Sequence, residues 1–305
     1  MNYAKLKKVA AALDLSEIDR FYRSMRRKIG RKGNEISCYL KAWLFKHILG
    51  IPSESQLAKR IQLDKELQRL CGFKKSPCKS AYCKARKRLA LKGLEFFFAF
   101  LVLKAKAVKL ISGRFVAVDS TDFSACCNIR RDPDKLSDKC AQWGYSSTKG
   151  FVFWYKVHIA CDTESELPIA AVVLPANEHD SVGFFPLFKK LLAYFKCIWK
   201  LIADCAYDSL EIRKALHGIE ALIARNGRGK FESENPKDRD YRKRTAIERV
   251  NSRCKLELGL DNLKMRGLWA ASFHAMEVLC SMLYAAVGSF IAGFKDWRSI
   301  VNLRG

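Results

Sequence analysis

The stretch FVFWYKVHIACDTESELPIAAVVLP, residues 151–175, decides the fold that the sequence predicts. Its first part, residues 151–162, alternates in the manner of a long β-strand, and residues 167–175 form a second apolar run. The polar residues 163–166 between them indicate a turn. The sequence therefore predicts a β-hairpin as the centre of a sheet.

Two shorter apolar runs flank this hairpin, and each ends in an acidic residue. RFVAVD ends at Asp119, and IWKLIAD ends at Asp204. We expect these strands to be parallel neighbours joined by a crossover helix, which places their carboxyl ends, and the two aspartates, side by side. The other elements expected in this half are helices at 181–196 and 208–217, a strand at 219–224, and a polar linker at 226–240.

The N-terminal third has a helical pattern that begins at Ser16. Glycine and proline residues separate its segments, and Ser53 with Gln56 is a typical helix start. The expected helices lie near 16–29, 36–49, 53–60, 64–70, 79–91 and 93–110.

Positive charge is concentrated in this helical third. The chain has 56 Lys plus Arg and 31 Asp plus Glu, a net charge of +25, and residues 1–110 hold 27 of the basic and 8 of the acidic residues. Such a concentration of positive charge favours a nucleic acid as the partner over an anionic membrane surface. The alternative, that the charge serves only solubility, is disfavoured at this density. On the basic helix at 79–91, Lys84, Arg86 and Lys87 are candidate phosphate contacts, with a solvated basic face as the alternative.

Length and composition exclude several classes of protein. The 305 residues, 49% of them apolar, support one large or two ordinary packed domains. The 12 cysteines include no CxxC pair and follow no secretion signal, so we expect free thiols in a reducing cytoplasm rather than zinc ligands or disulfides. The uncharged run at 278–294 is interpreted as a buried terminal helix and not as a membrane span.

The stretch YRKRTAIERVNSRCK, residues 241–255, predicts an amphipathic helix. At helical spacing Tyr241, Arg244, Glu248 and Lys255 share a stripe about 60° wide, opposite an apolar face. An ordinary ion pair between Arg244 and Glu248 is the simpler reading of the helix taken alone.

Asp119, Asp204 and Glu248 together predict a metal site. Two aspartates at adjacent strand ends and a glutamate from a helix packed across them can hold two divalent cations about 3.5–4 Å apart. Carboxylate oxygens suit Mg²⁺, for which Mn²⁺ can substitute. Basic residues of the same helix are expected to offset DNA phosphate charge: Arg244, Arg249, Arg253 and Lys255.

Other polar residues compete for these roles. Asp122 is a rival of Asp119, and Asp208 is better explained as the start of the next helix. The polar run 177–180, which ends at Asp180, is interpreted as a turn and helix cap and is left out of the catalytic set. Residues 143–145 are interpreted as a packed surface loop, with base stacking as the alternative.

Over residues 36–290 the sequence resembles the insertion-sequence DDE transposases that carry a Y-R-E-K signature. Tyr241, Arg244, Glu248 and Lys255 match that signature in spacing, and the stretches VAVDSTDF and LIADCAYDS match around the two aspartates. The resemblance implies a ribonuclease H-like core, a two-metal site at the three acids, cutting and rejoining of DNA at transposon ends, and phosphate contacts by the other three signature residues. Two departures are the 43 residues between Asp204 and Glu248, too few for the β insertion of some relatives, and Trp154, where relatives often carry glycine.

The sequence thus predicts an α/β protein: a ribonuclease H-like mixed sheet with flanking helices, after an all-helical region. The expected domains are a DNA-binding region at 1–110, a catalytic core with its closing helix at 111–292, and a tail at 293–305. The expected function is a Mg²⁺-dependent DNA transposase of the prokaryotic cytoplasm, associated with the nucleoid and acting on terminal inverted repeats and target DNA as a homodimer. The alternatives are a domesticated DNA-binding protein without catalysis and an RNA-processing nuclease of the same fold.

Overall fold

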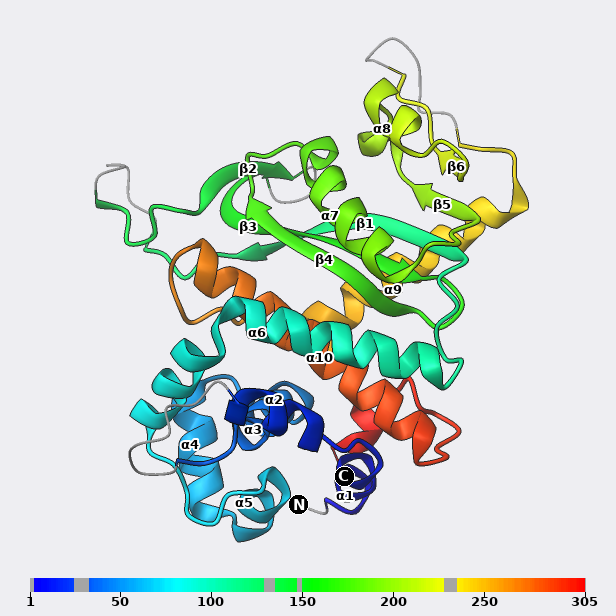
Figure 1. The fold of residues 1–305 in the computed structure, drawn as a ribbon. Helices are drawn as coiled ribbons and strands as arrows, with labels where there is room; N and C mark the ends of the chain where they lie inside the picture. Colours follow the sequence, from blue (N-terminus) through cyan, green and yellow to red (C-terminus); the bar gives the residue numbers. More distant parts are fainter. Residues whose placement is uncertain (1–2, 25–32, 129–134, 147–149, 228–234, 305) are drawn as a thin grey trace. The chain divides into compact units, whose positions relative to one another are not determined.

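The chain folds into two compact units, which are coloured along the sequence in Figure 1. The computed structural model describes residues 3–24, 33–128, 135–146, 150–227 and 235–304. The helical unit consists of Met1–Val108, Leu256–Asn262 and Met276–Gly305. The sheet unit consists of Lys109–Lys255 and Leu263–Ala275. The C-terminal segment therefore belongs to the helical unit and not to the sheet unit.

The helical unit begins with a helix that the sequence analysis did not predict, α1, and continues through the expected ones. Its helices before the sheet are α1 (Ala4–Ala12), α2 (Ser16–Ser24), α3 (Ile36–Ile48), α4 (Glu54–Leu63), α5 (Lys65–Cys71) and α6 (Lys79–Ala107). The last two predicted helices are joined in α6, where Ala90, with φ 54°, breaks the helical geometry between them. An alanine can adopt this left-handed φ only at a cost, so Ala90 marks a kink and not a regular turn of helix.

Short polar residues set the ends of these helices. Ser53 accepts a hydrogen bond from the Gln56 backbone N–H and so begins α4, as the sequence predicted. Asp64 caps α5 in the same way by accepting from Leu67 N. Gly72 ends α5 with φ 87°, a conformation that favours glycine.

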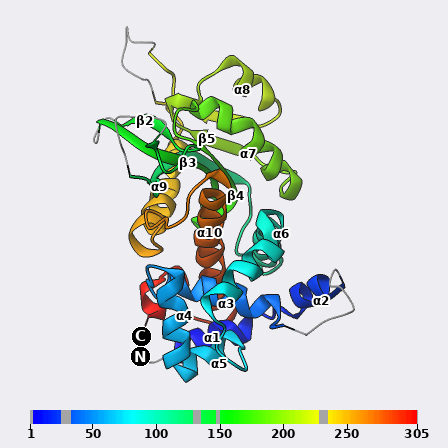
Figure 2. The same cartoon turned by 90° about the vertical axis from the view of Figure 1, so that its left-hand side faces the viewer.

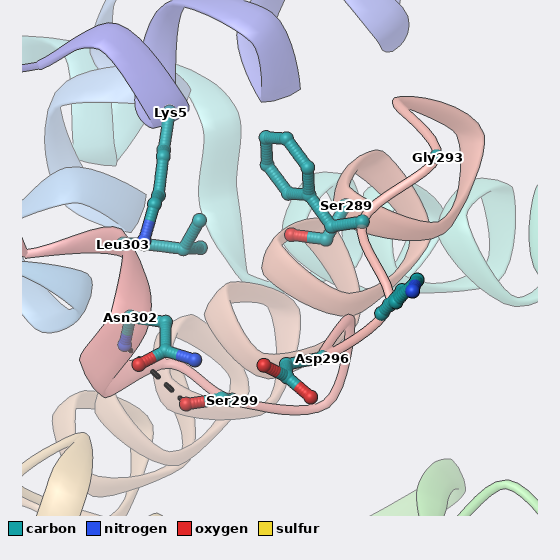
Figure 3. Close-up of a pocket in the computed structure, with 9 residues that line it drawn as sticks. Lys5, Ser289, Gly293, Asp296, Ser299, Asn302 and Leu303 are labelled. Atoms are coloured by element: carbon teal, nitrogen blue, oxygen red, sulfur yellow. Dashed lines mark hydrogen bonds between the residues drawn. The ribbon is translucent and has the colours of Figure 1, made fainter.

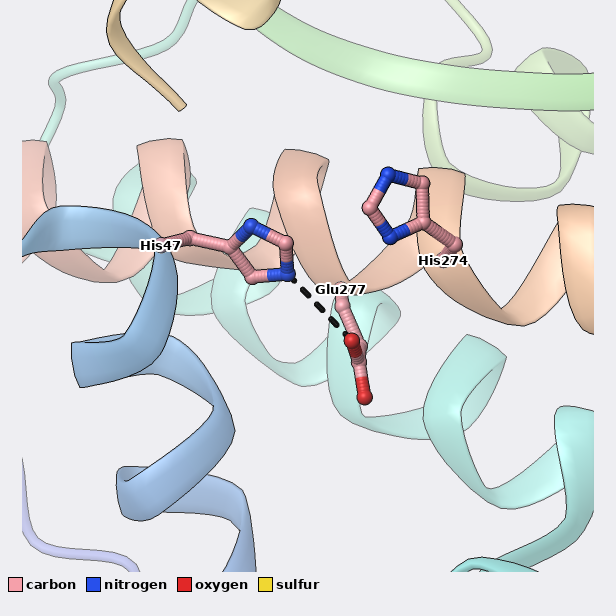
Figure 4. Close-up of side chains that lie close together, drawn as sticks. All are labelled: His47, His274 and Glu277. Carbon is pink, nitrogen blue, oxygen red and sulfur yellow. Dashed lines mark hydrogen bonds and ion pairs between the residues drawn. The ribbon is translucent and has the colours of Figure 1, made fainter. Parts of the chain in front are cut away.

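A buried group of charges joins α3 to the later part of α10 (Leu268–Ile291). Glu277 Oε2 lies 2.8 Å from Lys46 Nζ and 3.2 Å from His47 Nε2, and Figure 4 shows the His47 and Glu277 side chains. Burial alone would raise the pKa of Glu277, but the charge of Lys46 and the hydrogen bond from His47 hold that pKa well below its usual range. This ion pair is therefore charged in the folded protein and joins α3 to α10 within the helical unit.

Among the described residues one helix, α10, has the length and composition of a membrane span. Of its most apolar window, 89% is buried in the protein, as is usual for a core helix. The expected terminal apolar helix is thus present, and its side chains pack inside the protein.

The chain beyond α10 turns back and encloses a small pocket of about 270 Å³ within the helical unit (Figure 3). Lys5 reaches it from α1, and Ser289 lines it from α10. Asp296 and Asn302 come from the C-terminal segment, where Ser299 Oγ accepts from Asn302 N. None of the residues that the sequence places in the catalytic site lines this pocket.

The sheet unit contains one mixed sheet (Figure 1). Its strands are β1 (Phe115–Ser124), β2 (Gln142–Ser146), β3 (Gly150–Asp162), β4 (Leu167–Pro175), β5 (Lys200–Ala203) and β6 (Glu220–Ile223). The predicted hairpin is β3–β4, which is antiparallel, and β3 also pairs antiparallel with β1. On the other side of β1, β5 and β6 run parallel to it. The antiparallel strands β1 to β4, with β5 and β6 parallel to β1, form the ribonuclease H-like mixed sheet that the sequence predicted.

The turn between β3 and β4 is organised by a buried carboxylate, Asp162. It accepts hydrogen bonds from Gly113 N at 2.8 Å, from Ser112 Oγ at 3.1 Å, and from the backbone and hydroxyl of Ser165. These donors replace the hydrogen bonds to water that Asp162 loses on burial, so the buried carboxylate stabilises the turn. Asp162 therefore fixes the turn to the start of β1.

Helices cover both faces of this sheet. The helix α7 (Asp180–Tyr194) packs on β3 and β4, whereas α9 (Thr245–Ser252) packs on β1 and β3. Figure 2 shows the two helices on opposite sides of the strands. Side chains alternate along a strand, so Asp119 faces α9 while Ser120 faces α7.

Three local expectations were wrong. The first strand does not end at Asp119, because β1 continues to Ser124. Residues 143–145, predicted as a loop, lie in the strand β2, where Gly144 leaves room for the Trp154 side chain: a Cβ there would come within 2.6 Å of Trp154 Nε1. The stretch 241–255 is not one regular α-helix. It begins as the 3₁₀ turn η3 (Arg239–Arg244), continues as α9, and ends in the π-helical segment η4 (Arg253–Glu257).

The approach of α7 to the sheet gives a testable prediction at Gly183. A Cβ at this position would come within 2.5 Å of the His158 ring on β3. Although Gly→Ala normally stabilises a helix by up to about 1 kcal/mol, we expect Gly183→Ala to destabilise the protein by about 1–3 kcal/mol through overpacking. The midpoint of urea unfolding measures this. Val182→Ala, at a 51% exposed neighbouring position, is the matched control, and a stabilised Gly183→Ala variant would contradict the prediction.

Candidate active site

Asp119 lies in the middle of β1, and Asp204 directly follows the parallel neighbour of that strand, β5. The register pairs Ala117 on β1 with Ile202 on β5, and two further residues along each strand bring Asp119 beside Asp204. Neighbouring strands are about 4.8 Å apart, so the two side chains share one small region. One oxygen of Asp204 accepts from Ala206 N at 3.0 Å, and Asp119 Oδ2 accepts from Asn251 Nδ2 on α9 at 3.0 Å.

The closeness of these two carboxyl groups changes their acidity. Burial raises the pKa of Asp119 to about 7, and the negative charge of Asp204 adds to the effect. Burial also raises the pKa of Asp204. The Arg244 charge acts in the opposite direction on the pKa of both aspartates. The site therefore holds like charges that repel each other, an arrangement that a bound cation would relieve.

The third acid, Glu248, is linked to the two aspartates by Arg244, which pairs with Glu248 and whose charge acts on Asp119 and Asp204. Arg244 Nη2 lies 2.6 Å from Glu248 Oε1, so the ion pair expected from the helix alone does form. Tyr241 lies in the same field: burial raises its pKa, and the charges of Asp204 and Glu248 raise it further. Residues three apart on a 3₁₀ turn eclipse each other, which keeps Tyr241 and Arg244 aligned despite the irregular helix.

The chemistry of the three acids suits hard divalent cations. Their oxygens do not all lie within 4.8 Å of one another, as ligands of one ion would. All three donors are carboxylates, the oxygen ligands that Mg²⁺ prefers.

Two arginines proposed as phosphate contacts are used elsewhere. Arg249 Nε lies 2.7 Å from Glu166 Oε1, and Arg253 donates to the backbone oxygen of Glu166 at 2.6 Å. The Arg253 side chain is only 12% exposed. Both arginines therefore hold α9 and η4 to the turn between β3 and β4. Lys255, in η4, is half-buried and forms no ion pair within the described part of the chain.

The basic helix α6 shows a similar division between surface and structural charges. Lys84 and Lys87 are exposed, as a phosphate contact requires. Arg86 is 6% exposed, pairs with Glu54, and stacks over the Trp43 ring at 5.7 Å. The prediction that Arg86 contacts phosphates is therefore wrong, because its guanidinium is buried inside the helical unit.

The rivals of the chosen aspartates have roles of their own. Asp208 pairs with Arg213 at 2.8 Å and accepts from Asn226 N, and it is Ser209, not Asp208, that caps α8 (Leu210–Ala215). Asp122 lies on β1 opposite Lys156 of β3.

Sequence reasoning left out one carboxylate that the structure brings to the site, Asp180. His179, not Asp180, caps α7, by accepting from Ser181 N. Asp180 accepts hydrogen bonds from Ser120 Oγ and Lys156 Nζ, and its charge contributes to the raised pKa of both Asp119 and Asp204. The only signal in the sequence was Lys156, which lies on the same face of β3 as His158. That Lys156 pairs with Asp180 could not be inferred without the position of α7.

The mixed sheet, with Asp119 on β1, Asp204 directly after the parallel β5 and Glu248 on a covering helix, has the arrangement of a ribonuclease H-like fold. A family model described as "Transposase DDE domain" matches residues 111–284, and one described as "Transposase domain (DUF772)" matches residues 2–88. The chain belongs to the DDE transposase family and is a DNA transposase. No curated protein matches the chain significantly.

Solved structures with partial likeness include two kinds of transposase complex. The piggyBac transposase synaptic complex with hairpin DNA is 11% identical, with a TM-score of 0.45, and the match covers 99% of this chain and 79% of that one. The Mos1 transposase paired-end complex is 9% identical, with a TM-score of 0.23, and covers 82% and 88%. At these scores the likenesses add nothing to the family assignment.

The raised pKa of Asp119 predicts how stability depends on pH without metal. A group whose folded pKa, about 7, exceeds its ordinary 3.8 lowers stability as pH rises between these values. In EDTA, Asp119→Asn should therefore unfold at a higher temperature than wild type at pH 8, and the difference should vanish towards pH 4. Thermal unfolding followed by circular dichroism measures this. Asp261→Asn, at an exposed carboxylate, should track wild type; an equal gap at both pH values would contradict the assignment.

Proposed function

We propose that this transposase cleaves the ends of an insertion sequence and joins the freed 3′ ends to target DNA, with Asp119, Asp204 and Glu248 as ligands of two Mg²⁺ ions. The observation that supports this most directly is the register of β1 and β5, which sets Asp119 beside Asp204. Family membership supplies the DNA substrate and the strand-transfer chemistry. Mn²⁺ is expected to replace Mg²⁺, because it accepts the same oxygen ligands.

The bound ions would activate a water or a 3′ hydroxyl and stabilise the leaving oxygen of an in-line displacement. Asn251 keeps the Asp119 carboxylate oriented through its hydrogen bond at 3.0 Å. Glu248 is held by Arg244 until it is needed as a ligand. Releasing Glu248 would leave the Arg244 guanidinium free to pair with a DNA phosphate, for which its planar donors are suited.

Tyr241, Arg244 and Lys255 are proposed to contact phosphates at the terminus of the element. All three keep some exposed surface, and Tyr241 and Arg244 lie in the field of the catalytic acids. Arg249 and Arg253 are proposed to act indirectly, by fixing α9 to the turn at Glu166.

The helical unit is proposed to bind double-stranded DNA at the terminal inverted repeats. Residues 1–110 carry most of the excess positive charge of the chain, and Lys84 and Lys87 are exposed on α6. Because two ends must be joined in one reaction, a homodimer is proposed for the complex with both ends. A prokaryotic cytoplasm, with the nucleoid as the source of target DNA, is the proposed setting.

Cleavage of DNA that carries the inverted repeats flanking the gene tests this function. Asp119→Asn, Asp204→Asn and Glu248→Gln should each lower the cleavage rate by at least about 1000-fold, since bound metal supplies several kcal/mol to the transition state. Binding of the same DNA, measured by fluorescence anisotropy, should stay within a few fold of wild type. Asp208→Asn, which removes a carboxylate paired with Arg213, is the control and should cleave normally.

Three outcomes would contradict the proposal. Full cleavage by Glu248→Gln would remove Glu248 from the site. Wild-type protein that binds the ends tightly but never cuts them, with either metal, would indicate a domesticated DNA-binding protein. Preferential cleavage of RNA, with no joining of DNA ends, would indicate a processing nuclease.

A further inference from the structure

The 3₁₀ segment η3 is tied to the sheet by a lysine, Lys200. This residue begins β5, the strand that Asp204 directly follows. Its Nζ lies 2.6 Å from Asp238 Oδ2 and 2.9 Å from Asp240 Oδ2. Asp238 is the cap residue of η3, and Asp240 is the second residue of the segment. Lys200 therefore holds the first turn of η3 against β5.

Further contacts fix the two acids that Lys200 binds. Asp238 Oδ1 accepts a hydrogen bond from Asp240 N at 2.7 Å and so caps η3. Asp240 Oδ1 lies 2.9 Å from Lys243 Nζ, and this ammonium group stands over the ring of Phe115, 3.6 Å from its centroid. Phe115 begins β1 and is the register partner of Lys200 on β5. The segment η3 is thus bound to the starts of both strands.

Each charge in this cluster stabilises the others. Hydrogen bonds with Asp238 and Asp240 raise the pKa of Lys200. Lys200 in turn lowers the pKa of Asp238, and Lys243 together with Lys200 lowers the pKa of Asp240. The side chains of Lys200 and the two aspartates are 18–30% exposed, so water screens each pair in part. An isolated pair of this kind contributes little, but a network of short contacts around one lysine fixes a definite geometry.

The anchored residues of η3 stand next to the residues proposed to contact DNA. A 3₁₀ helix repeats every three residues, so residues three apart share an edge of it. Asp240 and Lys243 share the edge that is bound to the strands, and Tyr241 and Arg244 share the next edge. The charge of Arg244 acts on the pKa of Asp204, and the charge of Asp204 acts on the pKa of Tyr241. One edge of η3 therefore anchors the segment while the adjacent edge meets the catalytic region.

We propose that Lys200 is a positioning residue of the DNA cleavage reaction, which fixes η3 so that Tyr241 and Arg244 meet a phosphate at the end of the element. This inference rests on the proposed function, in which those two residues contact phosphates. Within the described residues, the ion pairs of Lys200 are with the two aspartates of the cluster and with Glu220 on β6. Lys200 thus acts through η3 and not on the proposed metal ligands.

Substitutions on both sides of this tie test the proposal. Lys200→Met removes the charge and keeps the length of the side chain. The single-turnover rate of end-DNA cleavage, with protein in excess and DNA saturated, should fall by about 10–100-fold, because misplacing a positioning group by about 1 Å can cost that much. Asp240→Asn breaks the tie from the other side and should lower the rate in the same way. Lys200→Arg keeps the charge and can donate to two carboxylates, so it should retain most of the rate.

Glu220→Gln is the matched control. Glu220 Oε1 also pairs with Lys200 Nζ, at 3.3 Å, but Glu220 lies on β6 and its side chain is 52% exposed. Its loss leaves the tie to η3 in place, so the rate should stay within about twofold of wild type. Thermal unfolding confirms that each variant is folded. Isothermal titration with MnCl₂ should give Lys200→Met the affinity of wild type, because the three proposed metal ligands are unchanged.

A double-mutant cycle with Arg244→Gln separates positioning from a general loss of stability. If Lys200 acts through η3, adding Lys200→Met to Arg244→Gln should lower the rate by less than about threefold, because the residue that it positions is already gone. A purely structural role would give the same loss in both backgrounds.

The outcomes distinguish this inference from the proposed function. A lower rate for Lys200→Met that Lys200→Arg restores and that Arg244→Gln suppresses supports the inference. An unchanged rate, an equal loss in both backgrounds, or weaker Mn²⁺ binding by Lys200→Met overturns it. If Arg244→Gln alone cleaves as wild type does, the phosphate contact of the proposed function fails and the inference falls with it, a result that does not depend on any Lys200 variant.

Discussion

Repulsion between two aspartates is the constraint on which the rest of the sheet unit depends. The parallel register of β1 and β5 sets Asp119 beside Asp204, and burial keeps water from screening them fully. A fold that holds like charges together gives up stability in the metal-free protein. In the proposed function, a bound divalent cation would relieve that repulsion.

The elements around the two aspartates limit this cost without removing it. Arg244 lies close enough to lower the pKa of both, while its guanidinium is paired with Glu248. Asn251 donates to Asp119, and the arginines bound to Glu166 fix the helix from which Asn251 and Glu248 project. Arg244 thus offsets part of the negative charge of the acids, and Asn251 holds Asp119 by a neutral hydrogen bond.

The sequence predicted the parts of this arrangement that depend on local pattern. The short apolar run before Asp204 predicted the end of β5, and the hairpin at 151–175 predicted the mixed sheet, whereas β1 continues past Asp119 to Ser124. The partners of charged side chains were not predictable, because they lie far away along the chain. Arg86 meets Glu54 over 32 residues, and Arg253 meets Glu166 over 87. The partner of Asp180 was missed for the same reason, since Asp180 lies on α7, Lys156 lies on β3, and only the packing of α7 brings the two together.

The most direct test of a two-metal site at these acids is the position of bound ions. Anomalous X-ray scattering from crystals of the protein with Mn²⁺ and cleaved end DNA would locate them. Two peaks about 3.5–4 Å apart, with Asp119 shared between them and with Asp204 and Glu248 each bound to one, are the result expected. Ions bound at other residues, or a Glu248 carboxylate that remains on Arg244 while both ions are bound, would contradict the account.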